Sequence, residues 1–219
     1  MSGAALAELQ ATLAEIYDLP PTPDVRDFLF TDRARLAGLS AARDCDEQLL
    51  LAEEEDALSM ALNVDAQVLQ RLAGRDPRAA LTHENLADYL TAAEGVSHFV
   101  YVAWNTAFDK PVTLLELELQ AEVDKYVLCA WLLSAQNAGR FPRELHHALF
   151  ERTRIDPKAA AGREGLYHTA SRYAARFCRR MATTLSRRHR GSMREALAEL
   201  RRFYRWGNAR KLAHIERFA

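Results

Sequence analysis

The clearest pattern in the chain is a pair of long apolar runs, residues 84–108 and 113–135, joined by a short connection at 109–112. In both runs the apolar residues recur every three or four positions, which is the spacing of a helix that buries one face. Thr113 and Glu116 have the spacing of a capping box, in which two side chains satisfy free amide groups at a helix start. The pattern therefore predicts two long helices that fold back on each other as an antiparallel hairpin.

Strict alternation of side chains, the pattern of a strand, occurs over residues 57–64. The preceding run Gln48–Glu53 predicts a partner strand, so a small β-hairpin is expected near 48–64. The turn between the two runs, residues 54–56, lacks glycine, and a helix through this region is the alternative. A two-stranded hairpin is marginal alone, so we expect it to pack on helices.

Shorter amphipathic segments surround these elements. The first helix is expected to begin at a Ser2 cap and to end near Tyr17, because the prolines that follow cannot continue a helix. Ser192 and Glu195 form a second capping box. The other amphipathic or helical segments are expected at 24–39, 65–73, 143–152, 167–185, 192–206 and 209–218. The predicted fold class is mainly α, a multi-helix bundle built on the long hairpin with at most one small β-hairpin.

Charge divides the chain into two halves, although the net charge of the 219 residues is −1. Residues 140–219 hold 20 Lys and Arg against 7 Asp and Glu, a net charge of +13, and residues 1–139 carry the compensating −14. We expect a single domain, 1–219, in which the acidic half 1–139 packs against the basic half 140–219. The alternative is that the basic half contacts nucleic acid or a membrane surface.

Composition narrows the class of protein. Hydrophobic residues make up 49% and charged residues 27%, as in ordinary globular proteins. We expect neither a signal peptide nor a membrane span, because the chain has no basic-then-apolar start and no long uncharged apolar run. The three cysteines are far apart and odd in number, which is typical of reduced thiols in the cytoplasm.

Ionisable residues lie where the two long helices are expected to be apolar. Glu94 and His98 are four apart on the first, and Glu118 and Glu122 are four apart on the second, so each pair shares a helix face. Counting equally from residue 110 predicts that His98 faces Glu122 across the hairpin.

Three hypotheses fit this group. In the first it is a polar core network, with His98 bonded to Glu122, Glu94 to Lys125, and Arg172 or Arg176 near Glu118. In the second, Glu94, His98, Glu118 and Glu122 bind one or two metal ions, with His168 as a further ligand. The Glu-x-x-His motif usual in such bundles is missing, which counts against this hypothesis. In the third, the same four residues act as catalytic acids and bases without a metal.

A second candidate site lies near the end of the chain, where basic and aromatic residues are interleaved. Such a composition is used to bind phosphates and stacked bases. The nucleic-acid-binding candidates are Arg201, Arg202, Arg205, Arg210 and Lys211. The alternative is an ordinary core stripe with solvated arginines on its other face.

The sequence favours a non-catalytic role, as a protein-interaction or self-associating module. A metal-dependent helix-bundle enzyme is the first alternative and nucleic-acid binding by the basic half is the second. Nucleophile motifs, phosphate-binding glycine loops and nucleotide fingerprints are missing, and no motif identifies a cofactor.

Overall fold

A computed structural model describes residues 3–32, 45–54, 57–142, 144–151, 162–186 and 191–218. Its centre is the predicted antiparallel helical hairpin, formed by α4 (Leu86–Thr106) and α5 (Leu114–Gln136). Thr113 caps α5, because its hydroxyl accepts a hydrogen bond from the Glu116 amide at 3.2 Å. The predicted fold class, mainly α with a small β element, is confirmed.

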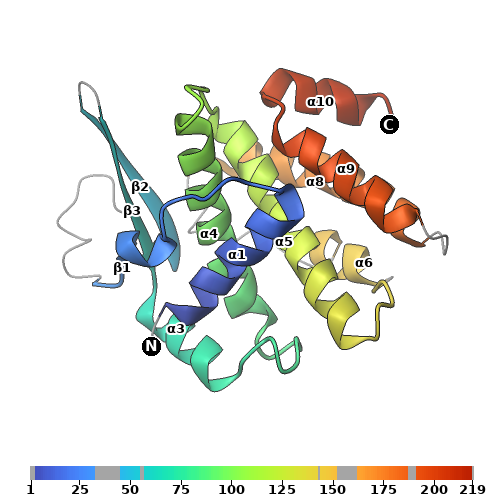
Figure 1. Cartoon of the computed structure of the whole chain (residues 1–219), viewed down its shortest axis with the longest axis horizontal. Coiled ribbons are helices and arrows are strands. Elements are labelled where there is room, and N and C mark those ends of the chain that lie inside the picture. The colour runs from blue at the N-terminus through green and yellow to red at the C-terminus, as the bar shows by residue number, and fades with distance from the viewer. Residues whose placement is uncertain are drawn as a thin grey trace.

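The other helices pack around this hairpin (Figure 1). On one side α1 (Ala4–Tyr17) packs on α4 and α9, while α8 (Glu164–Ser186) packs on α5. The remaining helices are α3 (Ala66–Gly74), α6 (Leu145–Phe150), α9 (Ser192–Tyr204) and α10 (Asn208–Glu216). Among the described residues, no helix is both long enough and apolar enough to cross a bilayer.

The predicted β-hairpin is present as β2 (Glu47–Glu54) and β3 (Ala57–Val64), which pair antiparallel with Leu49 opposite Leu62. The sequence did not predict β1 (Leu29–Phe30), which pairs parallel to β3 and gives the order β1-β3-β2. A short 3-10 turn, Val25–Phe28, leads into β1. These two elements replace the start of the amphipathic segment expected at 24–39, and residues 33–39 lie outside the described residues.

Some predicted helix starts and ends differ. The predicted capping box at Ser192 is wrong, because Gly191 and not Ser192 is the N-cap of α9. The helix expected at 143–152 is described only as α6, since residues 143 and 152 lie outside the described residues. At the other helix starts, the Asp65 side chain caps α3 by accepting from the Gln67 amide, and the predicted cap Ser2 lies outside the described residues.

A buried polar network joins the C-terminal helices to the central hairpin. Lys211, fully buried on α10, donates to the Tyr101 hydroxyl at 2.8 Å and to the Gln120 side-chain oxygen at 2.7 Å. The Tyr101 hydroxyl in turn donates to Glu116 at 2.5 Å. Glu116 also accepts the Asn208 amide, so it serves this network as well as the start of α5. The organisation of 1–219 as a single domain stays a prediction.

Candidate metal centre

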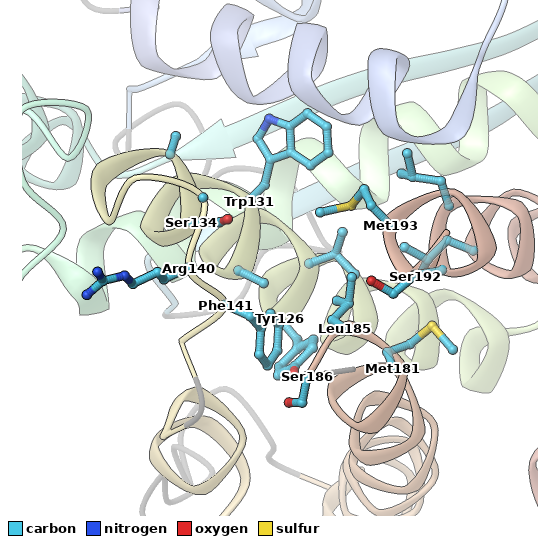
Figure 2. A pocket seen from close by; sticks show the side chains of 17 residues that line it. Tyr126, Trp131, Ser134, Arg140, Phe141, Met181, Leu185, Ser186, Ser192 and Met193 are labelled. Atoms are coloured by element: carbon cyan, nitrogen blue, oxygen red, sulfur yellow. The ribbon is translucent and has the colours of Figure 1, made fainter. Parts of the chain in front are cut away.

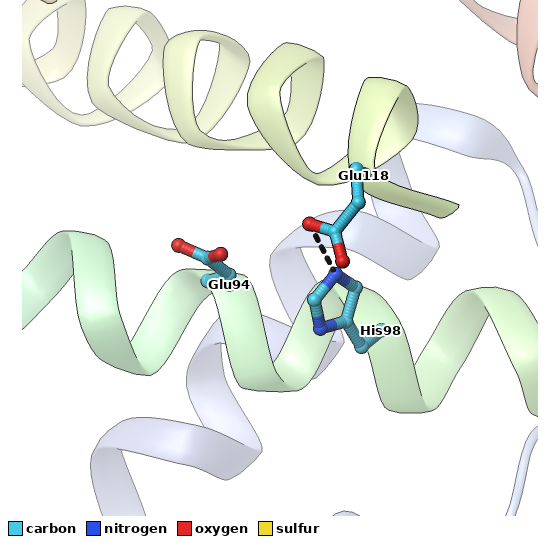
Figure 3. Close-up of side chains that lie close together, drawn as sticks. All are labelled: Glu94, His98 and Glu118. Atoms are coloured by element: carbon cyan, nitrogen blue, oxygen red, sulfur yellow. Dashed lines mark ion pairs between the residues drawn. The ribbon is translucent and has the colours of Figure 1, made fainter. Parts of the chain in front are cut away.

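Glu94, His98 and Glu118 come together between the two central helices. One possible ligand atom from each residue lies within 4.8 Å of those of the other two. Figure 3 shows His98 and Glu118 pointing toward each other from α4 and α5, with Glu94 one turn earlier on α4. The four-residue spacing of Glu94 and His98 places both on one face of α4, as the sequence predicted.

His98 is held by a carboxylate on each side of its ring. The Nδ1 atom lies 3.4 Å from Oε1 of Glu47, a residue of β2, and Nε2 lies 3.5 Å from Oε2 of Glu118. The residue is 6% exposed, and Nε2 lacks a partner with hydrogen-bond geometry. A histidine with one nitrogen facing a carboxylate, and the other free of a hydrogen bond and close to a possible co-ligand, has an arrangement that a metal-binding imidazole can adopt.

Gly95 makes room for Glu47 at this position. A Cβ atom on Gly95 would lie 2.8 Å from Cγ of Glu47 and 3.0 Å from Cδ1 of Leu62, closer than side chains tolerate. The missing side chain therefore lets the β-hairpin reach the turn of α4 that carries Glu94 and His98. A glycine inside a helix, next to Glu94, is a sequence signal for such a close approach, but it does not identify Glu47 as the residue that approaches.

Lys125 neutralises the other end of the cluster. Its Nζ lies 2.9 Å from Oε2 of Glu94 and 2.6 Å from Oε1 of Glu122. The predicted contact between Glu94 and Lys125 is thus confirmed. Glu122 has a quarter of its side chain exposed, and its partner is on its own helix.

The predicted contact between His98 and Glu122 is wrong, because Glu118 occupies that place. Residues 110–113 lie outside both helices, and Thr113 is extended. An extended residue advances about 3.3 Å along the chain and a helical residue about 1.5 Å. Residues 110–113 therefore span a greater distance than the same number of helical residues would. The residue of α5 that lies opposite His98 is consequently nearer the start of α5 than equal counting predicts.

Burial and the neighbouring charges shift the pKa values of the residues in the cluster. Burial lowers the pKa of His98, but the Glu118 and Glu47 carboxylates outweigh burial and raise it well above its ordinary value. Burial raises the pKa of Glu47. Burial also raises the pKa of Glu94, but the Lys125 ammonium outweighs it and the net direction is downward. Four carboxyl groups, from Glu47, Glu94, Glu118 and Glu122, thus lie around two basic groups, His98 and Lys125.

The other residues named in the metal and polar-network hypotheses are not part of the cluster of Glu94, His98 and Glu118. His168 is exposed near the start of α8 and is not part of the group of three possible ligands, so its role as a further ligand stays a prediction. Arg172 and Arg176 are also exposed on α8, where their guanidinium groups lie 5.7 and 6.0 Å from the Tyr173 ring. The basic partner of Glu118 is His98.

The basic residues proposed for nucleic acid have mixed roles. Arg201 donates to the backbone carbonyls of Glu15 and Ile16 at the end of α1, and Arg205 donates to those of Tyr17 and Asp18.

The prediction for Lys211 is wrong, because it is fully buried and cannot reach a phosphate. Arg202 is exposed, and the exposed Arg210 stacks over the Trp206 ring at 4.6 Å. Nucleic-acid binding by the basic half stays a prediction, with Arg202, Arg205 and Arg210 as its exposed candidates.

Comparisons of the chain with models of protein families, with characterised proteins and with solved structures found no match.

Proposed function

We propose that the protein binds a divalent metal ion between α4 and α5, with Glu94, His98 and Glu118 as ligands. The observation that carries this proposal is the His98 ring, whose Nε2 is buried without a hydrogen bond 3.5 Å from Glu118 Oε2, while Nδ1 faces Glu47. A carboxylate on the far nitrogen orients a ligating imidazole and makes it more basic. The four carboxyl groups around two basic groups support the same conclusion, because buried charges are paired or bind cations.

One imidazole nitrogen and two carboxylate oxygens suit first-row divalent ions such as zinc, manganese or iron. Metal–ligand distances of about 2.1 Å need the ligand atoms closer together than their present 4.8 Å limit, so binding would draw the three side chains inward. Lys125 keeps its contact with Glu122 when Glu94 turns toward the ion. Three protein ligands leave coordination positions for water or a substrate, which is the arrangement of catalytic zinc sites.

The test is the metal content of tag-free protein after incubation with zinc or manganese and gel filtration. We expect about one ion per chain for the wild type and for Glu122→Gln, since the three ligands that we propose do not include Glu122. We expect Glu118→Gln and His98→Gln to lose the ion. Stoichiometric metal in all four proteins, or in none, would contradict the proposal. In the latter case the cluster is a polar network that stabilises the hairpin.

Self-association, or binding of a protein partner, is the second function that we propose. The hairpin of β2 and β3 extends away from the helices (Figure 1), and Leu51 on β2 is 49% exposed. An apolar strand at the side of a sheet favours pairing with another chain. Sedimentation velocity should show a species larger than a monomer that Leu51→Lys converts to monomer. A monomeric wild type would exclude self-association.

We also propose a cytoplasmic location, on the basis of the thiols. All three cysteines lie in the described ranges and none forms a disulfide. Cys129 and Cys178 are buried, and the Cys45 thiol donates to the Glu47 carbonyl at 3.0 Å. Thiols without disulfides are typical of a reducing compartment. Fractionation of the source cells, followed by immunodetection, tests this proposal, and recovery outside the cytoplasm would contradict it.

A further inference from the structure

The side-chain nitrogen of Lys211, on α10, is fully buried and has two hydrogen bonds. Nζ donates to the Tyr101 hydroxyl at 2.8 Å and to the Gln120 side-chain oxygen at 2.7 Å. A carboxylate oxygen of Glu116 lies 4.0 Å from Nζ, which is too far for a hydrogen bond. A protonated lysine has three N–H donors and a neutral lysine has two. The contacts that the described residues make with Nζ therefore match the neutral amine.

Among the described residues, two acidic groups lie near Lys211, and neither accepts a hydrogen bond from it. Glu116 accepts instead from the Tyr101 hydroxyl. Asp124 lies behind Gln120, whose side-chain nitrogen donates to it at 2.7 Å. Burial disfavours the charged form of Lys211 and outweighs the attraction of both carboxylates, so the pKa of Lys211 falls to about 7.

The other titratable groups around Lys211 keep their charge state just above pH 7. Tyr101 of α4 contacts Lys211, Tyr204 of α9 packs edge-on against Tyr101, and Tyr17 of α1 donates to Asp124. Burial raises the pKa of all three tyrosines, so their hydroxyls stay neutral. Burial raises the pKa of Asp124 only to about 6, so this carboxyl is already charged at pH 7. Lys211 is therefore the group of the network whose charge changes above pH 7.

The rest of α10 is weakly attached to the protein. The helix has nine residues, and an isolated helix of this length is marginal in water. Its two buried residues are Lys211 and Ile215. It follows Gly207, an exposed residue in the extended conformation, and Figure 1 shows it at the outer edge of the molecule beside α9. The state of Lys211 therefore has a large share in holding α10 in place.

Polar contacts at partly exposed positions complete the attachment. His214 Nε2 lies 3.0 Å from Oε1 of Glu199 on α9, and the Tyr173 hydroxyl of α8 donates to Glu216 at 2.7 Å. Arg180 of α8 also pairs with Glu199, at 2.9 Å, so Glu199 keeps a basic partner when α10 leaves. Ion pairs that water reaches contribute little to stability.

We propose that the docking of α10 is a pH-sensitive switch: α10 is docked on the central hairpin while Lys211 is neutral, and it opens when Lys211 takes up a proton. The pKa of Lys211 is about 7 in the docked state and has its ordinary value, 10.5, once the side chain reaches water. The open state therefore binds more protons between these two values, and docking tightens as pH rises above 7.

This switch is separate from the metal proposal. None of the residues of α10 belongs to the group of Glu94, His98 and Glu118, and none lines the cavity of about 670 Å³ between α5, α8 and α9 (Figure 2). Opening of α10 can therefore be measured in EDTA, where no metal is bound.

Hydrogen exchange of the full chain, followed by mass spectrometry, measures the opening once rates are corrected for the intrinsic effect of pH on exchange. In the wild type the amides of α10 should be less protected than those of α4 and α5, because α10 opens without global unfolding. Their protection should rise about twentyfold from pH 6.5 to pH 8.5, the factor for one proton with these two pKa values.

Two variants of Lys211 separate charge from shape. Lys211→Met has no charge at any pH, so protection of α10 should be high at pH 6.5 and should not rise. Lys211→Arg is charged at every pH, so α10 should stay weakly protected even at pH 8.5. Both variants retain His214 and Glu199, whose contribution is any slope that remains. Arg210→Met removes a charge from the exposed neighbouring position and should keep the wild-type rise.

The lysine Cε signals in an NMR titration of the wild type give the pKa of Lys211 directly, whether or not the variants fold. One lysine should titrate near pH 7. Three outcomes would overturn the proposal: no lysine that titrates below pH 9, α10 amides as protected as those of α4 and α5 at pH 6.5, or the same twentyfold rise in Lys211→Met. Each of these results is independent of the zinc content of the protein.

Discussion

Glu47 Oε1 lies 3.4 Å from His98 Nδ1, although 51 residues separate the two in the chain. The contact joins the β-hairpin to α4 and holds the imidazole so that Nε2 faces Glu118. In the metal-free protein the same carboxylate stabilises the protonated ring, because opposite charges attract strongly where water is excluded. The hairpin therefore contributes to the cluster as directly as the two helices do.

Glu47→Ala should weaken metal binding without removing a ligand. Loss of a carboxylate behind a ligating histidine costs about 10–100-fold in affinity. Isothermal titration with zinc measures this change, and Glu53→Ala, an exposed position on the same strand, is the control that should leave affinity unchanged. Equal affinities for the Glu47 and Glu53 variants would show that Glu47 does not support the site.

Gly95→Ala should destabilise the protein even though alanine favours helix. The gain in helix propensity is about 1 kcal/mol, but overpacking against Glu47 and the fully buried Leu62 costs about 1–3 kcal/mol. Urea unfolding measures whether the substitution lowers or raises the free energy of unfolding. Gly165→Ala on α8, where a new Cβ meets nothing within 4 Å, should be neutral or stabilising. A Gly95→Ala protein more stable than the wild type would contradict the close approach of Glu47.

The metal-free protein should lose the stabilisation due to His98 as pH rises. The folded-state pKa of His98 is raised above its ordinary value of about 6.5. The stabilisation is therefore complete below about pH 6.5 and is lost as pH rises through the folded-state pKa. Unfolding free energies of wild type and His98→Gln, measured in EDTA from pH 6 to 9, should converge as pH rises.

Two further considerations separate the contribution of His98 to the pH dependence of stability from that of other groups. Burial lowers the pKa of Lys211 to about 7, which makes stability rise with pH, but both proteins share this trend and it cancels in their difference. Zinc competes with the proton on His98, so zinc affinity should rise over the same pH range. A difference between the two proteins that stays constant or grows with pH would contradict a protonated His98.

Arg201→Ala should destabilise the protein by about 1–2 kcal/mol, because the carbonyl of Ile16 would lose its side-chain donor and that of Glu15 would keep only the Asp18 amide. Arg202→Ala, at the exposed neighbouring position, should stay within about 0.5 kcal/mol of the wild type. Thermal or urea unfolding compares the two. Equal effects would show that the end of α1 does not depend on Arg201.

The central hairpin was predictable because its evidence is local. The runs 84–108 and 113–135 differ from α4 and α5 by one or two residues at each end, and the Thr113 cap acts on the helix that follows it. The β-hairpin was predictable from alternation for the same reason. The very short strand β1 was not, since two residues carry no periodicity.

The sequence identified three of the residues that come together, but it did not predict which of them contact each other. Glu94, His98 and Glu118 were identified because charges on apolar helix faces are unusual, but the pairing depended on the shape of the connection at 110–113. Glu47 could not be placed, because nothing local relates a strand to a helix 51 residues away. The one available signal was Gly95 beside Glu94.

For Lys211 the prediction failed in a different way. A basic residue close to other basic residues was expected at the surface, but it is buried. Its spacing of four from Ile215 places both on one face of α10, and both are buried. That spacing, together with polar groups on the central hairpin, was the signal for an internal lysine.

Anomalous diffraction at the zinc edge, from crystals of the zinc-loaded protein, tests the central claim most directly. We predict one strong peak between α4 and α5, within about 2.5 Å of His98 Nε2 and of carboxylate oxygens of Glu94 and Glu118. Glu47 should remain on Nδ1 and Lys125 on Glu122. A peak elsewhere, or no peak with His98 still between Glu47 and Glu118, would contradict the metal centre.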